Sequence, residues 1–228
     1  MSELETLRRK IRMQAISISL AITPFGVAFG ALCTEAGLGT WEALGFSSLV
    51  FAGSSQFAAV TVLAEGGTIM AAVIAGLLLN LRSLAFGVAM APSLQGSVLW
   101  RAITSQLMID EATAVGSSQE SQALRRYGYI WAGLSVFVLW NLMTWVGVTL
   151  LSGTGTLIQD LGIDATIPAA FLGLVWPKLS SKEHQVIAGV GAVVAFLLVP
   201  FVPLGIPVIA AAAAVLLLRP WGKRGSHE

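Results

Sequence analysis

A series of long apolar runs, which fill most of the 228-residue chain, constrains the fold more than any other feature. Crossing the hydrocarbon core of a bilayer takes roughly 17 to 25 apolar residues in a helix. Runs of about this length cover residues 14–33, 42–64, 67–92, 128–151, about 162–177, 185–200 and 204–219. Only 11% of the residues are charged, against about 25% in soluble domains, so few remain to cover a water-facing surface. The sequence therefore predicts an all-α polytopic membrane protein with about six to seven transmembrane segments, some of them broken or re-entrant.

The basic residues predict how the chain is threaded, because Lys and Arg near span ends favour the cytoplasmic side. All but one of the thirteen lie in polar groups within residues 1–13, 93–127, 178–182 and 219–224. If these groups are all cytoplasmic, both termini are cytoplasmic, residues 1–13 form a lead-in and residues 93–127 a cytoplasmic or interfacial connection. Residues 1–228 are expected to form a single transmembrane domain.

This threading requires an even number of crossings between Arg12 and Arg101, yet three apolar runs lie between them. One of the three is therefore expected to be a re-entrant hairpin or a pair of broken half-helices. The alternative is that residues 94–108, which are short and contain Arg101, also cross the membrane.

Three stretches are candidates for helix breaks. Pro24 lies inside the first run and cannot bond the carbonyl four residues earlier. Residues 51–57, "FAGSSQF", combine glycine with serines, which are poor helix formers. Asn80 and Arg82 would point about 200° apart on a continuous helix, so both reach one cavity only if the chain unwinds locally. Irregular backbone at membrane depth lies in protein or lines water, so these breaks predict a polar cavity.

Arg82 is the one basic residue inside an apolar run. An arginine at the bilayer centre costs about 2.5–3.5 kcal/mol on insertion scales, and such residues commonly mark functional sites. Its donors match a carboxylate in two places at once, so we expect it to hold an anionic group in an aqueous cavity. The alternative is an ion pair or carbonyl contact that only ties helices together.

Other polar residues near the expected breaks are candidates for the same site. Asn80 and Gln56 could contact a ligand, or could instead form interhelical hydrogen bonds. Gly53, Ser54 and Ser55 are placed at the substrate site because a break there frees backbone carbonyl groups. The alternative for the two serines is that they satisfy those carbonyls.

Asp110 and Glu111 form the only adjacent acidic pair in the sequence. Carboxylates beside a cavity could relay protons or bind an ammonium group. The alternative is a solvated helix start, with Asp110 as the N-cap and Glu111 in the first turn.

Several function classes lack the residues that they require. There is no phosphate-cradling G-x-x-x-x-G-K-[ST] sequence and no Ser/His/Asp or Cys/His set, so neither an ATP motor nor an enzyme is expected. A single cysteine, Cys33, excludes an internal disulfide, and with two histidines no metal site is expected. No cofactor is expected. A net charge of +1 without a basic, aromatic-interleaved patch gives no reason to expect a nucleic-acid partner.

Four motifs are similar to those of a known family: "ITPFGVAFGALCTEAGL", "SSLVFAGSSQFAAVTVLAEG", "LLLNLRSLAFGVAMAP" and "DEATAV". Over residues 14–116 the chain resembles the AzlC family, the large subunits of bacterial branched-chain amino acid exporters. The resemblance implies a multi-pass protein of the bacterial cytoplasmic membrane that works with a small hydrophobic subunit of the AzlD type. It also implies export of branched-chain or other hydrophobic amino acids, in some members methionine.

Together, the residues and the resemblance suggest how the protein could bind an aliphatic amino acid at a site within the lipid bilayer. Arg82, or the N-terminal end of a half-helix, would take the carboxylate. Freed carbonyls near residues 53–55, with Gln56, would take the ammonium. The apolar side chain would lie in a pocket lined by Phe51, Phe57 and Leu81.

Without an ATP site, the expected energy source for export is the proton gradient, with Asp110 or Glu111 as the proton carrier. Two alternatives are a passive channel for a small solute and a non-transporting scaffold or assembly subunit. In the scaffold, the polar membrane residues would only tie helices together.

Overall fold

The computed structural model describes residues 3–151, 172, 176–202, 207 and 210–211, and all their regular secondary structure is helical. The predicted all-α class is therefore confirmed. The helices are α1 (Glu3–Ala21), α2 (Thr23–Glu35), α3 (Thr40–Val50), α4 (Gly53–Ala64), α5 (Ile69–Asn80), α6 (Arg82–Met90), α7 (Val98–Ser105), α8 (Asp110–Ser117), α9 (Gln122–Leu151), the 3-10 helix η1 (Trp176–Ser180) and α12 (Lys182–Leu198).

Three helical stretches in the described residues are long and apolar enough to cross a membrane. They are Glu3–Glu35, Ile69–Met90 and Gln122–Leu150. The predicted count of six to seven spans is not confirmed. The run at 185–200 falls on α12, whose apolar part is shorter than a span. Most of residues 162–177 and 204–219 lies outside the described part of the chain.

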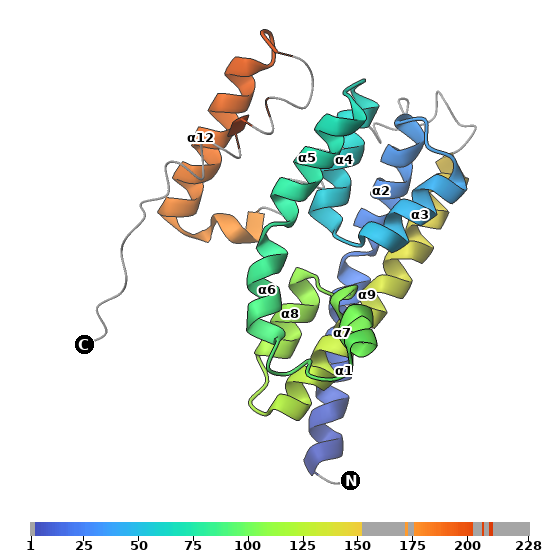
Figure 1. The fold of residues 1–228 in the computed structure, drawn as a ribbon, viewed down its shortest axis with the longest axis vertical. Helices are drawn as coiled ribbons and strands as arrows, with labels where there is room; N and C mark the ends of the chain where they lie inside the picture. Colours follow the sequence, from blue (N-terminus) through green and yellow to red (C-terminus); the bar gives the residue numbers. More distant parts are fainter. Residues whose placement is uncertain (1–2, 152–171, 173–175, 203–206, 208–209, 212–228) are drawn as a thin grey trace.

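The run at 42–64 is not one straight span. Its helix ends at Val50, two residues with non-helical backbone angles follow, and a new helix begins at Gly53. The chain reverses there, and α3 and α4 form a hairpin whose second arm packs on α5 (Figure 1). Residues 51–57 are one of the breaks that the sequence predicted, and of the three apolar runs between Arg12 and Arg101 this is the one that forms a hairpin.

Two long helices are interrupted rather than reversed. The first stops at Ile22, where the hydroxyl of Thr23 donates to the carbonyl of Leu20 at 2.7 Å. Leu20 is the residue whose helical partner Pro24 removes, so the threonine replaces the missing donor. The other interruption lies between α5 and α6 at Leu81, whose angles (φ −53°, ψ −29°) remain nearly helical. The break there is a single loosened turn and not the unwinding of residues 80–83 that the sequence suggested.

The first eight helices form two similar units of opposite direction. Each unit is an interrupted long helix followed by two short helices, and α1–α2 and α5–α6 run in opposite directions (Figure 1). In the first unit, α2 packs on α4, and α4 packs on the next long helix, α5. In the second unit, α6 packs on α8 in the same way, and α8 packs on the next long helix, α9. The tetrapeptide Phe-Gly-Val-Ala follows both interruptions, at residues 25–28 and 86–89. This arrangement places all the interruptions near the middle of the bundle.

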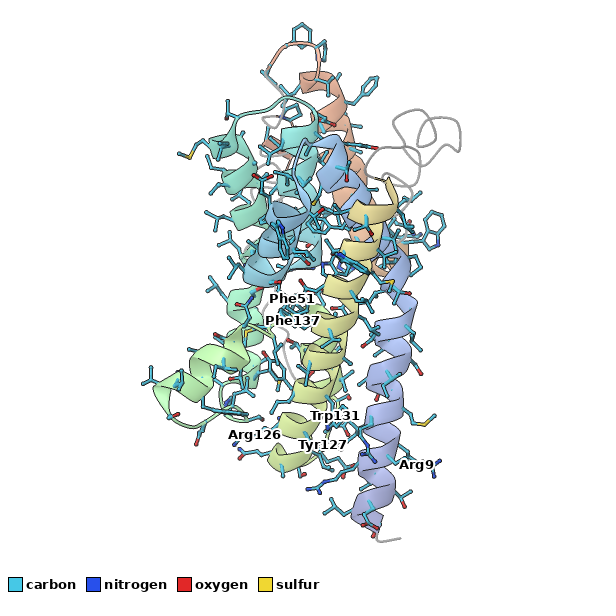
Figure 2. The ribbon with its side chains drawn as sticks, turned by 90° about the vertical axis from the view of Figure 1, so that its right-hand side faces the viewer. Arg9, Phe51, Arg126, Tyr127, Trp131 and Phe137 are labelled. Atoms are coloured by element: carbon cyan, nitrogen blue, oxygen red, sulfur yellow. The ribbon has the colours of Figure 1, made fainter. Side chains whose placement is uncertain are left out.

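One end of the bundle collects basic residues from the beginning of the chain and from the 93–127 segment. The guanidinium of Arg8 lies 5.3 Å from the ring centre of Tyr127, and that of Arg126 lies 4.5 Å from the ring centre of Trp100. Figure 2 shows Arg126 and Tyr127 at this end of the bundle. Cation–π contacts of this kind favour a basic residue over an aromatic face. The two basic groups therefore lie at the same end of α1 and α9.

Helices α2 and α9 approach closely through glycines, as in small-residue packing of membrane helices. A Cβ built on Gly30 would lie 2.8 Å from the backbone nitrogen of Val148, and one on Gly26 would lie 2.7 Å from Cβ of Met143. Gly147 faces the same seam from α9 and would meet the backbone of α2. The seam fixes α9 against the first interrupted helix.

We expect Gly30→Ala to destabilise the protein by at least about 1–3 kcal/mol, because the atoms in its way belong to backbone. The measurement is the free energy of unfolding in mixed micelles titrated with SDS. Gly45→Ala is the matched control, since no heavy atom lies within 4 Å of a Cβ there, and it should be neutral or slightly stabilising. Equal stability of the two variants would contradict this account of the seam.

Candidate functional site

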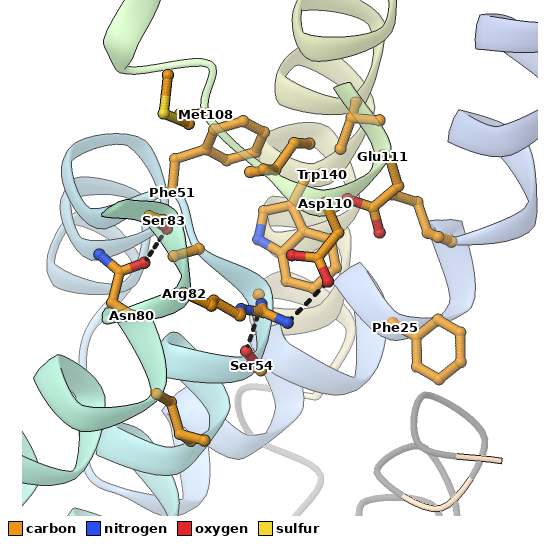
Figure 3. A pocket seen from close by; sticks show the side chains of 16 residues that line it. Phe25, Phe51, Ser54, Asn80, Arg82, Ser83, Met108, Asp110, Glu111 and Trp140 are labelled. Atoms are coloured by element: carbon orange, nitrogen blue, oxygen red, sulfur yellow. Dashed lines mark hydrogen bonds and ion pairs between the residues drawn. The ribbon is translucent and has the colours of Figure 1, made fainter. Parts of the chain in front are cut away.

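A cavity of about 350 Å³ lies where the helix interruptions meet (Figure 3). It brings together six of the residues that the sequence singled out for substrate or proton binding: Gly53, Ser54, Asn80, Arg82, Asp110 and Glu111. Ser54 and Arg82 are 28 residues apart in the chain, as are Arg82 and Asp110, so the fold rather than local sequence creates this cluster.

Several helices begin at the cavity wall. The first residues of α4, α6 and α8 line it, and so does Ile22, which precedes α2. The N-terminal end of a helix carries unpaired N–H groups and a partial positive charge. The starts of α4 and α8, which follow residues with non-helical backbone angles, favour negative charge in the cavity, and the carboxylates of Asp110 and Glu111 in the first turn of α8 suit this environment.

Arg82 is the basic residue of the cavity and bridges two other elements. Its Nη1 donates to Oδ2 of Asp110 at 2.7 Å, and its Nη2 donates to Oγ of Ser54 at 2.7 Å (Figure 3). The side chains of Arg82 and Asp110 are 35% and 29% exposed, so the ion pair lies in an open cavity rather than in a dry seam. The pair joins α6 to the start of α8, and the serine joins it to the start of α4.

Asp110 does not cap α8 as the helix-start alternative proposed. Ile109 occupies the N-cap position, and Asp110 is the first helical residue, with Glu111 next to it. Both acidic residues therefore stand in the first turn and also line the cavity. The two interpretations of the acidic pair do not exclude each other.

Asn80 and Ser55 line a second cavity, which shares only Asn80 with the charged one. The hydroxyl of Ser83 donates to Oδ1 of Asn80 at 2.7 Å, and Asn80 lines both cavities. Ser55 is 2% exposed and lines only the second cavity, a mainly apolar space between α3, α4 and α5. The structure thus separates Ser55 from Ser54, although they are neighbours in sequence.

Gln56, a predicted substrate residue, does not line the charged cavity. It is fully buried, and its Nε2 donates to the carbonyls of Phe46 and Ser47 at 3.3 and 3.1 Å. Gln106 donates to the next two carbonyls of α3 at 2.7 and 3.0 Å. The last carbonyls of a helix lack helical partners, so the two glutamines satisfy the end of α3 inside the bundle. Sequence reasoning missed Gln106, which has no local signal.

The apolar part of the cavity differs from the one expected. Phe51 lines it, with its ring 4.9 Å from that of Phe137 (Figure 2). Phe57 is instead buried in the core, and Leu81 is 51% exposed on the outside of the bundle. Sequence reasoning missed other lining residues: Ile22, Phe25, Met108, Ile109, Val136 and Trp140.

Interrupted helices around a charged cavity within apolar, span-length helices define a helical membrane protein with a ligand-sized internal site. The sequence profile described as AzlC protein matches residues 17–153. The chain belongs to the AzlC family, which confirms the resemblance seen in its motifs. The matched region contains every residue of the charged cavity.

Two curated relatives are similar over most of their length. An uncharacterized membrane protein of Archaeoglobus fulgidus is 32% identical over 222 residues, covering 93% of this chain and 94% of the relative. The inner membrane protein YgaZ of Escherichia coli is 26% identical over 182 residues, covering 74% of this chain and 72% of the relative. No solved structure is significantly similar to the chain.

We expect Gln56→Leu to lower the free energy of unfolding by roughly 1–3 kcal/mol, because it leaves buried carbonyl groups without a donor. Gln106→Leu should lower it as well, since the carbonyls of Ser48 and Leu49 lose their donor. Titration with SDS in mixed micelles measures the free energy of unfolding of both variants. A Gln56→Leu protein of native stability that no longer binds leucine would instead assign Gln56 to the substrate site.

Proposed function

We propose that the protein is a secondary transporter that exports apolar α-amino acids, with branched-chain amino acids and methionine as the substrate class. The observation that carries this proposal is the Arg82–Asp110 ion pair in a partly open cavity at the helix interruptions. Family membership supports transport, and the names of the relatives support a membrane location.

The ion pair is complementary to an amino acid zwitterion. In our proposal the substrate inserts between the partners, so that Arg82 binds its carboxylate and Asp110 binds its ammonium. Because the exchange replaces one ion pair with two, neither charge is left unpaired in the cavity, which would be costly. The aliphatic side chain then packs against apolar lining residues such as Phe51, Met108 and Val136.

The same arrangement suggests how a proton gradient could drive export. A proton on Asp110 removes the partner of the substrate ammonium, so proton and amino acid compete for one carboxylate. Because only one of the two can occupy the carboxylate at a time, such competition couples the entry of a proton to the exit of an amino acid. Glu111 is the second candidate carrier, and it lines the same cavity.

We further propose that the protein works with a small hydrophobic subunit of the AzlD type in the bacterial cytoplasmic membrane. Both termini would be cytoplasmic, together with the end that collects basic residues from α1, α7 and α9. The positive-inside tendency and the shared position of Arg8 and Arg126 support this orientation.

One observation favours a scaffold as the second candidate. Arg82 is already paired with Asp110 and Ser54, so it could serve only to tie α4, α6 and α8 together. A tie would affect stability without any response to amino acids. The passive channel would conduct substrate without any response to a pH gradient.

We expect Arg82→Ala to weaken leucine binding at least about 30-fold, because a carboxylate loses its charged partner inside the cavity. Arg82→Lys should restore binding only in part, since an ammonium lacks the planar fork. The measurement is titration calorimetry in nanodiscs with leucine, valine and methionine, with and without the small subunit. Arg101→Ala removes an exposed arginine outside this cavity and is the control. Unchanged leucine binding by a destabilised Arg82→Ala protein would favour the scaffold.

We expect Asp110→Asn to keep leucine counterflow at saturating substrate but to lose the response to an imposed pH gradient in inverted vesicles. The amide retains the shape of the side chain but cannot exchange a proton. Glu111→Gln should keep the response, which separates the two candidate carriers. If both variants were driven by the pH gradient as well as the native protein, neither residue would carry the proton.

A further inference from the structure

We infer that Trp140 contacts the substrate, donating its indole N–H, together with the Nε–H of Arg82, to the substrate carboxylate. This inference rests on the proposed function and concerns a residue on α9 that sequence analysis did not single out. It concerns how the cavity recognises the carboxylate end of an amino acid.

Two N–H donors of the cavity have no acceptor within the described residues. Trp140 is 6% exposed and lines the cavity, yet its Nε1 atom is buried without a hydrogen-bond partner (Figure 3). The Nε atom of Arg82 is buried without a partner as well, although both Nη atoms are used. A buried donor without an acceptor costs free energy, and buried tryptophan N–H groups usually find one.

The indole ring is held in place by aromatic neighbours. Its centre lies 6.0 Å from that of Phe29, with the rings nearly parallel at 28°, and 6.2 Å from that of Phe57, with the rings at 83°. Both phenylalanines are fully buried. A Cβ built on Gly53 would lie 3.4 Å from the indole Cη2 atom, so the glycine at the start of α4 leaves room for the ring. The N–H direction is therefore set before any ligand arrives.

The chemistry of the two donors selects their acceptor. An ammonium group and an aliphatic side chain accept no hydrogen bond, so neither can satisfy them. A carboxylate only accepts, and its two oxygens can take both donors at once. The nearby N-terminal ends of α4 and α8 favour the same negative group. The substrate carboxylate therefore belongs beside Trp140 and Arg82, and the ammonium beside Asp110.

The test compares leucine with 3-methylbutylamine, which has the same aliphatic chain and ammonium but no carboxylate. Competition against radiolabelled leucine, with protein in nanodiscs, measures the affinity of both ligands. We expect Trp140→Phe to weaken leucine binding about tenfold, as for loss of a hydrogen bond to a charged group, and to change amine binding less than threefold. The native preference for leucine over the amine should fall accordingly.

Trp100→Phe is the matched control. The Nε1 atom of Trp100 is also buried without a partner in the described residues, but Trp100 does not line this cavity. Its removal should leave both affinities unchanged. If Trp140→Phe does not fold, benzothienylalanine at position 140 keeps the ring shape and replaces only the N–H group with sulfur.

Three outcomes would overturn the inference. Unchanged leucine binding would show that the indole N–H does not contact the substrate, and an equal loss for leucine and the amine would show that the ring only packs. In both cases the native protein still binds leucine, so the proposed function stands. A native protein that binds no amino acid would overturn the proposed function and this inference with it.

Discussion

The interruption of helices deep inside an apolar bundle is the constraint on which the rest of the structure depends. A break frees backbone groups that lipid cannot satisfy, and at two of the breaks the chain supplies side chains as their partners. Thr23 donates to the carbonyl left free by Pro24, and Gln56 and Gln106 donate to the end of α3. These contacts allow half-helices to begin at mid-bundle, and the beginnings of those half-helices form the wall of the charged cavity.

The two oppositely directed units explain why the breaks coincide in space. Each unit interrupts its long helix just before a Phe-Gly-Val-Ala sequence and adds a pair of short helices. Because the units run in opposite directions, their second half-helices start from the same level and point away from it on both sides (Figure 1). Positive helix ends and one arginine thus face a carboxylate pair across a small volume.

The sequence predicted the helical class, the apolar stretches that became the three long helices, and the family, because composition and local motifs carry that information. The charged residues of the cavity were also predicted, since Arg82 and Asp110 are charges placed where charge is costly. The pairing of these two residues could not be predicted, because it depends on how α6 and α8 pack. Trp140 and Gln106 were missed for a related reason: an indole or an amide gives no local sign of what it faces. The four-residue repeat is too short to reveal the two units without the fold.

The ion pair itself argues for a site that changes its partners rather than for a fixed tie. Exposed ion pairs contribute little to stability, and replacing a buried pair by apolar residues is often neutral or stabilising, so an ion pair is a weak device for tying helices together. Here both charged side chains remain about one-third exposed, and a donor of Arg82 stays without an acceptor within the described residues. Apolar side chains such as those of Phe51, Met108 and Val136 also line the cavity. The cavity therefore contains positively charged donors, a negatively charged acceptor and a hydrophobic surface. An α-amino acid with an aliphatic side chain presents the complement of each of these three surfaces.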